Sequence, residues 1–516
     1  MSFRNYVESL LDVLARDPAH EVLVDPDGRR TTAGELYDGI LRTAGALSGH
    51  GVGRSSTVAL LSGNRSEALV SRYAANLLGA RVAFLHEVIH TRIAPAVVAH
   101  LVRSIDTGLL LIDPALPDLA AALLPLPDLP PALFLAPSPL GADLDPRDHH
   151  GPAPTNAARP EDDWCLRMTG GTTGIPKCVC MTHDRYLDVL AGRAALLHGT
   201  PCFLACASLA HSAGTTADAA LLAGGRVVLH REFAAGEVLA TIAREHVTDV
   251  WMPTTMLGQL LEHPAVGSTD TGSLRRLSYG GHLLSAARLR RAGEVFGPVV
   301  YGWYGQTEAG LITEVRPHEH TLLGRMGQVT AGRPVPGVEI AVRGETGGRL
   351  PAGQIGEIRV RSPQVMTGYW RQPGLNAEVL HDGWLRTGDA GYLDEEGYLY
   401  IAGRYKQMIK LAVGLQVFPA ELEAFLLTHP AVAQCMVFGV RRPDDAEDIH
   451  AAVVPDPGHR PDPTAIQDFV TAHQGPLHTP STVHVLTEMP LNPVGKPDRP
   501  RVLARLGLAD ENFATS

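Results

Sequence analysis

The chain has 516 residues, of which 45% are hydrophobic and 19% are charged, and its formal net charge at pH 7 is −11. This length and apolar content exclude a disordered chain and predict two or more domains with buried cores. The negative charge argues against a nucleic-acid partner, which usually requires a basic surface, and favours an enzyme that acts on small molecules.

The chain start and the cysteines favour a cytoplasmic protein without a membrane partner. Residues 1–8 lack the apolar core of a signal peptide, and no segment is long and apolar enough to span a bilayer. The best candidate, 120–140, is interrupted by prolines and is expected to be a strand between proline-rich connections. The six cysteines form no CxxC pair, so we expect buried thiols in a reducing compartment.

The first part of the chain alternates helical patterns with short apolar runs. Such runs occur at 57–61 and 80–85, within the segment 31–98. This alternation predicts βαβ units and a parallel sheet covered by helices. A polar, proline-rich stretch at 141–163 follows and is expected to be an exposed connection.

The loop at residues 168–177, with the sequence MTGGTTGIPK, combines glycines, hydroxyls and one lysine. Glycines let backbone N–H groups approach an anion, and the hydroxyls and Lys177 add donors and charge, so the loop suits a polyphosphate. Apolar runs on both sides predict that it joins two strands. A Walker A loop would need Gly before the lysine and a hydroxyl after it, whereas Pro176 and Cys178 stand there. Taken alone, the loop is also compatible with a hairpin that binds nothing.

A second series of strands and helices follows the loop, and its character changes after residue 329. The predicted strands of this series lie at 201–207, 225–229, 249–252 and 299–302. Beyond 329, short strands with Gly and Pro turns, at 338–343 and 356–361, indicate an all-β part. Pro419 is a helix start signal, and 432–440 is a predicted strand.

These patterns predict an α/β protein with two domains. A large N-terminal domain, 1–404, would contain two helix-covered βαβ sheets plus a small β-barrel-like subdomain. A small α/β C-terminal domain, 405–516, would follow it.

Motifs downstream of the loop carry groups suited to a nucleotide. The segment 301–308, YGWYGQTE, ends a strand with glycines that admit a flat ring, and its Glu308 is suited to Mg²⁺. Asp389 is suited to accept from both ribose hydroxyls, and Arg404 offers a second contact to ribose or phosphate. Lys496 lies in a proline- and glycine-rich loop, which is an unusual place for a lysine.

In this order the motifs resemble the adenylate-forming superfamily, which includes acyl-CoA and aryl-CoA synthetases, peptide-synthetase adenylation domains, luciferases and amide synthetases. The resemblance covers roughly residues 20–505. The matching segments are the 168–177 loop, 210–214 (AHSAG), 279–281 (YGG), 304–308 (YGQTE), 332–337 (GRPVPG), 387–389 (TGD), 403–404 (GR) and 492–496 (NPVGK).

The resemblance implies ATP and Mg²⁺ as cofactors. It also implies that the N-terminal domain, 1–404, binds the acid and ATP, and that the C-terminal domain, 405–516, is mobile and carries the catalytic lysine. Each motif then has an implied role. The β- and γ-phosphates would be bound by Thr169, Gly170, Gly171, Thr172, Thr173, Gly174 and Lys177. The adenine would be flanked by Gly280, Gly281, His282, Tyr301, Gly302, Trp303 and Tyr304. Thr307 and the metal ligand Glu308 would act at the α-phosphate, and Asp389 and Arg404 would hold the ribose. Lys496 would lie between the substrate carboxylate and the α-phosphate, and Lys406 would be the hinge for domain alternation between two half-reactions.

The acid-binding pocket implied by the resemblance lies between 209–217, the Gly280-Gly281 turn and 305–311. Its small residues indicate a roomy, mostly apolar slot for an aromatic or bulky acid. The expected substrate-binding residues are Leu209, His211, Ser212, Ala213, Gly280, Gly281 and Gly305. His211 is also a catalytic candidate that would gate the acceptor path, with a core histidine as the alternative. An amino-acid substrate is not favoured, although Asp218 lies nearby in sequence.

The acceptor is inferred from a departure from the family pattern. Many CoA-using members carry Ile-Lys, two residues and then Gly, whereas here Leu411, Ala412 and Val413 separate Lys410 from Gly414. We therefore expect an amine acceptor, as in an ATP-dependent amide bond synthetase of natural-product biosynthesis. The alternatives are an acyl-CoA synthetase with coenzyme A as acceptor, or the loading of a separate carrier protein, since no carrier segment is expected after residue 505.

Three functions stay open from the sequence alone. The leading one is an AMP-forming ligase that makes an acyl-adenylate. In this reaction the substrate carboxylate must attack the α-phosphate of a polyanionic nucleotide. Mg²⁺ and Lys496 would therefore neutralise the negative charges that repel each other. The second is a phosphotransferase or NTPase that uses the loop and forms ADP. The third is a silent acyl or nucleotide sensor, which the presence of Lys496, Glu308 and Asp389 disfavours. The enzyme is expected to be a monomer or a homodimer.

Overall fold

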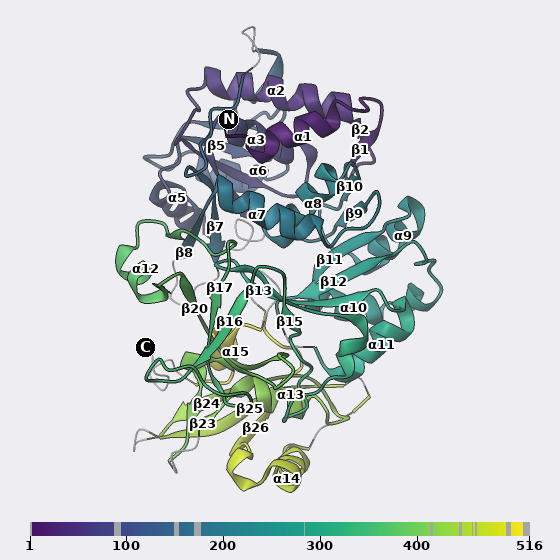
Figure 1. Ribbon diagram of the computed structural model, residues 1–516, viewed down its shortest axis with the longest axis vertical. Helices are drawn as coiled ribbons and strands as arrows, with labels where there is room; N and C mark the ends of the chain where they lie inside the picture. The colour runs from purple at the N-terminus through teal and green to yellow at the C-terminus, as the bar shows by residue number, and fades with distance from the viewer. Residues whose placement is uncertain are drawn as a thin grey trace.

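The computed structural model describes residues 3–86, 94–148, 154–169, 177–282, 284–412, 416–442, 446–456, 458–459, 462–491 and 497–508. Within these ranges the chain forms two large sheets, a five-stranded sheet and a smaller C-terminal sheet. Figure 1 shows them arranged along the long axis of the molecule, from the N-terminal helices at the top to the C-terminal elements at the bottom.

The first large sheet has seven strands in the described part of the chain and is mostly parallel. Its order is β18 (Gly368–Tyr369), β8 (Lys177–Thr182), β7 (Asp163–Thr169), β4 (Arg81–His86), β3 (Thr57–Ser62), β5 (Leu109–Ile112) and β6 (Ala132–Phe134). Its crossover helices are α3 (Ser66–Leu77), α5 (Pro95–Ser104) and α6 (Pro117–Leu123). Every residue of β3 is buried, as expected for a central parallel strand with both faces covered. The predicted strands at 57–61 and 80–85 are thus confirmed.

The second large sheet has nine strands in the described ranges. Its order is β15 (Arg333–Pro334), β14 (Gly310–Val315), β13 (Val300–Gln306), β12 (Arg276–Gly280), β11 (Asp249–Pro253), β9 (Cys202–Ala205), β10 (Arg226–Leu229), β1 (Glu21–Val24) and β2 (Arg30–Thr32). The helices of this series are α8 (Ser212–Leu222), α9 (Ala235–Glu245), α10 (Thr254–Glu262) and α11 (Ala286–Phe296). The four strands predicted between 201 and 302 are confirmed.

A shared core holds the two large sheets together. It contains side chains from β3, from β9 and β10, and from the helices between the sheets, including α1 (Tyr6–Leu14), α2 (Ala33–Gly49) and α7 (His183–Ala194). Figure 1 shows α7 and α8 between the upper and middle parts of the molecule. The loops at the ends of both sheets are therefore fixed relative to each other.

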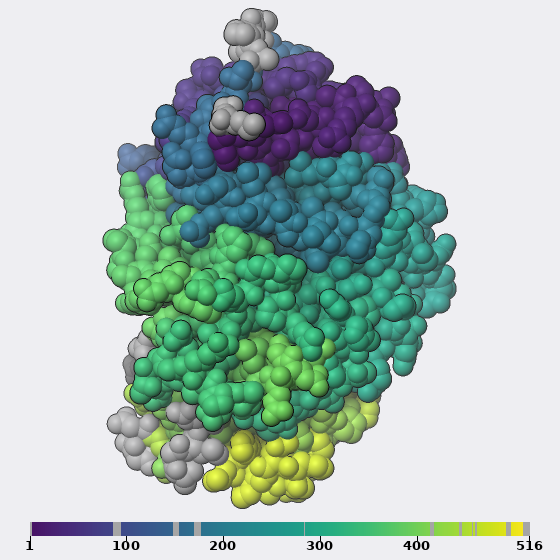
Figure 2. All heavy atoms as spheres, in the orientation of Figure 1, coloured from purple at the N-terminus to yellow at the C-terminus, as the bar shows by residue number. Residues whose placement is uncertain are grey.

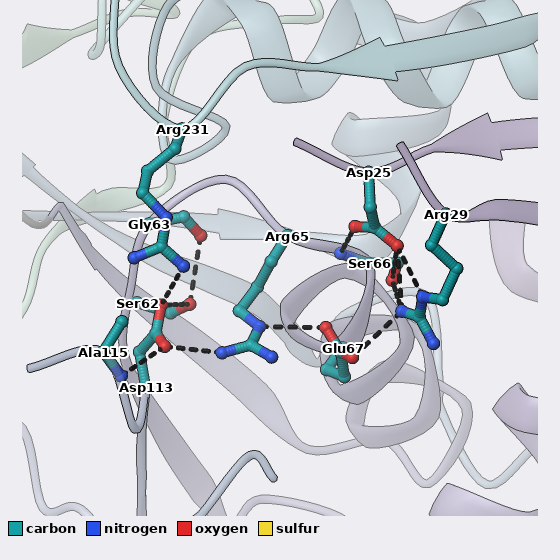
Figure 3. Close-up of polar contacts among 10 residues, drawn as sticks. All are labelled: Asp25, Arg29, Ser62, Gly63, Arg65, Ser66, Glu67, Asp113, Ala115 and Arg231. Atoms are coloured by element: carbon teal, nitrogen blue, oxygen red, sulfur yellow. Dashed lines mark hydrogen bonds and ion pairs between the residues drawn. The ribbon is translucent and has the colours of Figure 1, made fainter. Parts of the chain in front are cut away.

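A polar network at the sheet ends makes the same connection (Figure 3). Asp25 follows β1 of the second sheet and accepts hydrogen bonds from Ser66 N at 2.9 Å and from Ser66 Oγ at 2.6 Å, where α3 begins. Asp113 follows β5 of the first sheet and forms an ion pair with Arg65. Its Oδ2 atom also lies 3.9 Å from Nη2 of Arg231, a residue just after β10. Asp113 and its partner Arg65 are largely removed from solvent, with side chains 1% and 16% exposed, so salt screens their attraction less than it would at the surface.

The all-β part predicted after residue 329 is confirmed as an antiparallel sheet. Its strands are β16 (Glu339–Arg343), β17 (Gly356–Arg361), β20 (Trp384–Leu393), β19 (Leu380–His381) and β21 (Leu399–Arg404), and α12 (Pro373–Val379) lies beside it. Alternate residues such as Ile340, Ile358 and Val360 form its core.

The C-terminal part begins with the hairpin β22 (Ile409–Lys410) and β23 (Gln416–Val417). A sheet of β24 (Val432–Arg441), β25 (Glu447–Pro455) and β26 (Thr482–Val485) follows, with the helices α13 (Pro419–Leu426), α14 (Pro463–Gln474) and α15 (Arg499–Arg505). Figure 2 shows this part, in yellow, at the lower end of the molecule. Arg325 Nε donates to Glu421 Oε1 at 2.9 Å and so joins it to the larger part. The division at residue 404 stays a prediction.

One expectation about the fold needs correction. The stretch 120–140 is not one strand between connections, because its first residues end α6 and only Ala132–Phe134 form a strand. The N-terminal strands β1 and β2 belong to the second sheet, although they precede the first sheet in the chain. All six cysteines are buried free thiols, as expected. None of the helices in the described ranges combines the length and apolar character needed to cross a bilayer.

Candidate active site

The predicted phosphate loop joins the antiparallel strands β7 and β8. Thr169 pairs with Lys177 across this hairpin, and Thr169 Oγ1 lies 3.5 Å from the Lys177 carbonyl oxygen. The strand-to-strand setting that argued against a Walker A loop is thus confirmed. The other predicted phosphate ligands lie outside the described residues: Gly170, Gly171, Thr172, Thr173 and Gly174.

A tyrosine that the sequence did not single out connects this hairpin to Glu308. Tyr369 lies on β18, beside β8, and its ring centroid is 5.3 Å from Lys177 Nζ. Its hydroxyl donates to Glu308 Oε1 at 2.9 Å. Burial, together with the charge of Glu308, raises the pKa of Tyr369, so the phenol stays protonated and can donate.

Glu308 lies in the turn between β13 and β14, next to Thr307, and both side chains are half-buried. Among the described residues no three His, Cys, Asp or Glu side chains gather into a metal-binding cluster. Mg²⁺ is commonly held by one or two carboxylates together with substrate phosphates, and a single Glu308 carboxylate fits that mode.

Asp389 is the centre of a second polar cluster. It pairs with Arg404 across β20 and β21, and Arg404 Nε lies 3.1 Å from Asp389 Oδ1. Its other oxygen, Oδ2, accepts from Tyr304 OH at 2.7 Å and from Gln306 Nε2 at 2.6 Å. The structure therefore brings Tyr304 together with Asp389 and Arg404, which follow much later in the chain, and adds Gln306, to which no role was given.

The other expected adenine-binding residues on β13 do not contact the Asp389 cluster. Tyr301 lies under the guanidinium of Arg276, with 3.7 Å between its ring centroid and Arg276 Cζ. Trp303 Nε1 donates to Glu314 Oε2 at 3.0 Å. A side chain at Gly302 would meet the Tyr279 hydroxyl at 2.7 Å, so this glycine makes room for a tyrosine of the protein. Of the expected adenine-binding side chains on β13, only that of Tyr304 joins the Asp389 cluster.

The Gly280-Gly281-His282 turn begins at the last residue of β12. Gly280 pairs with Trp303 on β13, and Thr254 Oγ1 lies 3.0 Å from the Gly280 carbonyl oxygen. Gly281 and His282 are exposed. The turn is therefore next to Tyr304 at the carboxyl ends of parallel strands, where ligands bind in open α/β sheets.

The segment before α8 is only partly accessible. Leu209 and Ala213 are packed in the core, whereas His211, the residue before α8, and Ser212 are half-buried. Arg167 on β7 donates to Thr215 Oγ1 at 2.9 Å, which ties α8 to the strand that leads into the phosphate loop. The roles predicted for these residues in binding the acid stay predictions.

Asp218 on α8 is buried and bound by core side chains. Its carboxylate accepts from Tyr73 OH at 2.6 Å and also contacts Arg72 and Tyr186. Its exposed fraction is 1%, and its negative charge is balanced by a buried arginine. The structure therefore gives a physical reason against Asp218 as the partner of a substrate amino group.

Gly214 on α8 permits a close helix–loop contact. A Cβ at this position would lie 1.9 Å from the Leu209 carbonyl oxygen. We expect Gly214→Ala to lower the free energy of unfolding by about 3 kcal/mol or more, since backbone atoms would have to move. Gly293→Ala is the matched control, because a Cβ on that exposed residue of α11 meets nothing within 4 Å. It should stabilise the helix by up to about 1 kcal/mol. Equal melting temperatures for both variants would contradict this interpretation.

The remaining predicted residues belong to the C-terminal part. Lys406 is exposed in a short helical turn between β21 and β22, where a hinge between the two parts would lie. Lys496 lies outside the described residues.

Comparison with known proteins shows the family of the chain. Residues 11–370 match the AMP-binding enzyme family, and residues 421–496 match the AMP-binding enzyme C-terminal domain. A medium/long-chain-fatty-acid–CoA ligase of Mycobacterium tuberculosis is 32% identical over 499 residues, which cover 92% of this chain and 86% of that protein. A feruloyl-CoA synthase of Amycolatopsis sp. is 32% identical over 507 residues, which cover 96% and 97% of the two chains.

The structure of the amide bond synthetase McbA from Marinactinospora thermotolerans matches with a TM-score of 0.88 at 33% identity, over 98% of this chain and 99% of that chain. The fold and the ordered motifs thus lead to the same assignment. The chain belongs to the AMP-binding enzyme family and is an ATP-dependent acid ligase of the adenylate-forming superfamily.

Proposed function

We propose that this ligase converts a carboxylic acid and ATP to an acyl-adenylate and pyrophosphate, and then passes the acyl group to an amine. The segment 409–414 carries the choice of acceptor, because it is one residue longer and more apolar than the pattern of many CoA-using members. Similarity to an amide bond synthetase over nearly the whole chain supports the same choice. Thioester formation with coenzyme A is the second candidate, favoured by the comparable identity to CoA ligases.

The acceptor segment starts on a short hairpin at the surface of the C-terminal part. Lys410 is exposed, and its backbone N–H donates to Glu447 Oε2 at 2.8 Å. Leu411 is half-buried against the C-terminal core. Val413 and Gly414 lie outside the described residues. The contact with Glu447 therefore holds the start of the acceptor segment in place.

The Asp389 cluster would hold the nucleoside part of ATP. Asp389 would accept hydrogen bonds from the ribose hydroxyls, and Arg404 would stay beside it. The Tyr304 and Gln306 donors keep the Asp389 carboxylate in one orientation before the nucleotide binds. Such preorganisation reduces the entropy that binding would otherwise lose.

The Lys177, Tyr369 and Glu308 group would act on the phosphates. Lys177 lies at the base of the loop and would balance phosphate charge, and the Thr307 hydroxyl would donate to the α-phosphate. Glu308, held by Tyr369, would be a ligand of Mg²⁺, which would supply Lewis-acid stabilisation of the charge on the reacting phosphate. With the acid held beside Lys496, positioning would contribute much of the remaining acceleration.

The second half-reaction would follow a rotation of the C-terminal part about Lys406. This rotation would withdraw Lys496 and bring the 409–414 segment to the acyl-adenylate. His211, half-buried where α8 begins, would then lie on the acceptor path.

Acid-dependent exchange of pyrophosphate into ATP, measured over a broad panel of acids, tests the first half-reaction. Product analysis by mass spectrometry, with an amine or coenzyme A added, tests the second. Exchange with AMP release and an amide product would support the proposal. ADP release, or no exchange with any acid, would exclude it. Thioester formation without an amide would replace the amine with coenzyme A as the acceptor.

A further inference from the structure

Arg193 on α7 is buried and makes no side-chain hydrogen bond or ion pair with the residues that the structure describes. Its exposed fraction is 6%, and its Nη1 atom has no hydrogen-bond partner among the residues that the structure describes. The guanidinium lies over the indole of Trp303, with 4.1 Å between Cζ and the ring centroid. Trp303 is on β13, next to Tyr304 of the Asp389 cluster.

The charge on Arg193 is only partly compensated by the described residues around it. Burial, with the nearby charge of Arg167, lowers the pKa of Arg193 to about 10, so the side chain is still protonated at neutral pH. Glu314 is close enough to favour that charge. Its Oε2 atom, however, already accepts from Trp303 Nε1 at 3.0 Å and from Arg276 Nη1 at 2.6 Å. An additional anion would therefore be stabilised beside Arg193.

A cavity of about 280 Å³ provides the space for such an anion. Its polar lining consists of Arg193, Glu314, Arg316, Glu319, Arg333 and Gln364. Val189 of α7, Leu311 of β14 and Val335 form apolar walls. This volume is close to the lower end of the range of small-molecule pockets. The cavity therefore has room for the distal part of a substrate, with an apolar body and a charged end.

The cavity adjoins the turn that carries Thr307 and Glu308. Leu311, in its wall, pairs with Gly305 across the β13–β14 hairpin. Gln364, also in its wall, approaches Gly310 so closely that a Cβ there would lie 2.6 Å from Gln364 Oε1. Two residues further, Met366 N donates to the Glu308 carbonyl oxygen at 2.8 Å. An acid whose carboxylate reacts near Thr307 would extend into this cavity.

We propose that Arg193 is a specificity-determining residue that binds a second anionic group at the distal end of the acid substrate. This inference rests on the proposed acid activation and names the class of acid: a dicarboxylic acid or one with another anionic end. The apolar walls would contact the middle of the acid, and the guanidinium would pair with its distal anion. The activated carboxylate would lie at the opposite end, beside Glu308.

Packing alone does not account for an arginine at this position. A cation–π contact with Trp303 is weak compared with the desolvation of a buried guanidinium, which is offset only by an anionic partner. An apolar side chain of similar length would fill the same space beside Trp303 without that penalty. A residue that lowers stability in the free protein is expected where it acts on a ligand.

The first test compares matched pairs of acids in the pyrophosphate–ATP exchange assay. Each pair has the same chain length or ring, one member ending in a methyl group and the other in a second carboxylate. We expect the wild-type enzyme to prefer the dicarboxylic member in at least one pair by about thirtyfold or more in kcat/KM, on the order expected for a buried charge pair. Exchange with a preference for the methyl member in every pair would overturn the inference and leave the proposed function standing. No exchange with any acid would exclude both the inference about Arg193 and the proposed function.

The second test uses Arg193→Met, which keeps the length and removes the charge. We expect the preference for the dicarboxylic acid to fall by at least about thirtyfold, while kcat/KM for the methyl-ended acid stays the same or rises. The melting temperature should stay the same or increase, since a buried unpaired charge is removed. Arg193→Lys should restore part of the preference because it restores the charge.

Arg42→Met is the matched control, because Arg42 is an exposed arginine of α2 that pairs with Asp38 at the surface. This variant should leave the preference unchanged. An equal loss of activity with both members of a pair in Arg193→Met would mean a structural role and would overturn the inference.

Discussion

Lys496→Ala is expected to lower acid-dependent pyrophosphate–ATP exchange by at least about a hundredfold, the scale on which removal of one preorganised charge-stabilising group acts. In the proposed reaction Lys496 neutralises charge between the attacking carboxylate and the α-phosphate. Lys496→Arg should be nearly as slow, since a planar guanidinium cannot replace a compact ammonium at a crowded reacting centre. Initial exchange rates at saturating ATP and acid provide the measurement.

Arg505→Ala is the control for the Lys496 variants. Arg505 is an exposed residue of α15 that pairs with Glu488 at the surface, so its removal should change exchange less than about twofold. All variants should melt at the wild-type temperature. If Lys496→Ala exchanged pyrophosphate at a rate close to that of the wild type, the catalytic role of Lys496 would be refuted.

The distribution of lysines supports this assignment independently. Of the 44 lysines and arginines, only four are lysines: Lys177, Lys406, Lys410 and Lys496. Everywhere else the chain uses arginine as its cation. Each lysine lies in a segment that takes part in the proposed reaction, as the phosphate loop, the hinge, the acceptor loop or the loop that acts in adenylation. Because arginine suffices for solubility and surface pairing, lysine is expected where a small, mobile ammonium is required.

Local sequence patterns predicted the strands well, because buried parallel strands read as short apolar runs between turn residues. The runs at 57–61 and 356–361 correspond closely to β3 and β17. Local patterns did not predict which strands share a sheet. Strand β1 pairs with β10, some two hundred residues later in the chain, and no local pattern records that pairing.

In the candidate site, too, local motifs were predictable from the sequence, whereas contacts made only after folding were not. Motif order located the Asp389 cluster, since Tyr304, Asp389 and Arg404 each stand in a distinctive short segment. It gave no role to Tyr369 or Arg193, whose importance depends on what surrounds them after folding. Strand alternation also separated Trp303 from Tyr304, although the two are adjacent in sequence, and turned the indole toward Arg193.

Glu308→Gln is expected to lower the rate of adenylate formation by about a hundredfold or more and to raise the Mg²⁺ concentration needed for half-maximal rate. In the wild-type protein Tyr369 OH donates to Glu308 Oε1 at 2.9 Å. The glutamine amide keeps an oxygen that can accept this hydrogen bond, so the local structure should persist. What is lost is the negative charge that would hold the cation near the reacting phosphate. Magnesium titration of single-turnover adenylate formation measures both effects.

Tyr369→Phe separates the charge of Glu308 from its orientation. It removes only the hydroxyl that donates to Glu308 and keeps the ring that lies near Lys177 Nζ. We expect a smaller loss, less than about tenfold, because a single hydrogen bond to a charged group contributes roughly 1.5–3 kcal/mol and water can replace part of it. If Glu308→Gln left the magnesium dependence unchanged while Tyr369→Phe altered it, Glu308 would not be the metal ligand. The hydrogen bond between the two residues would then act only in shaping the turn.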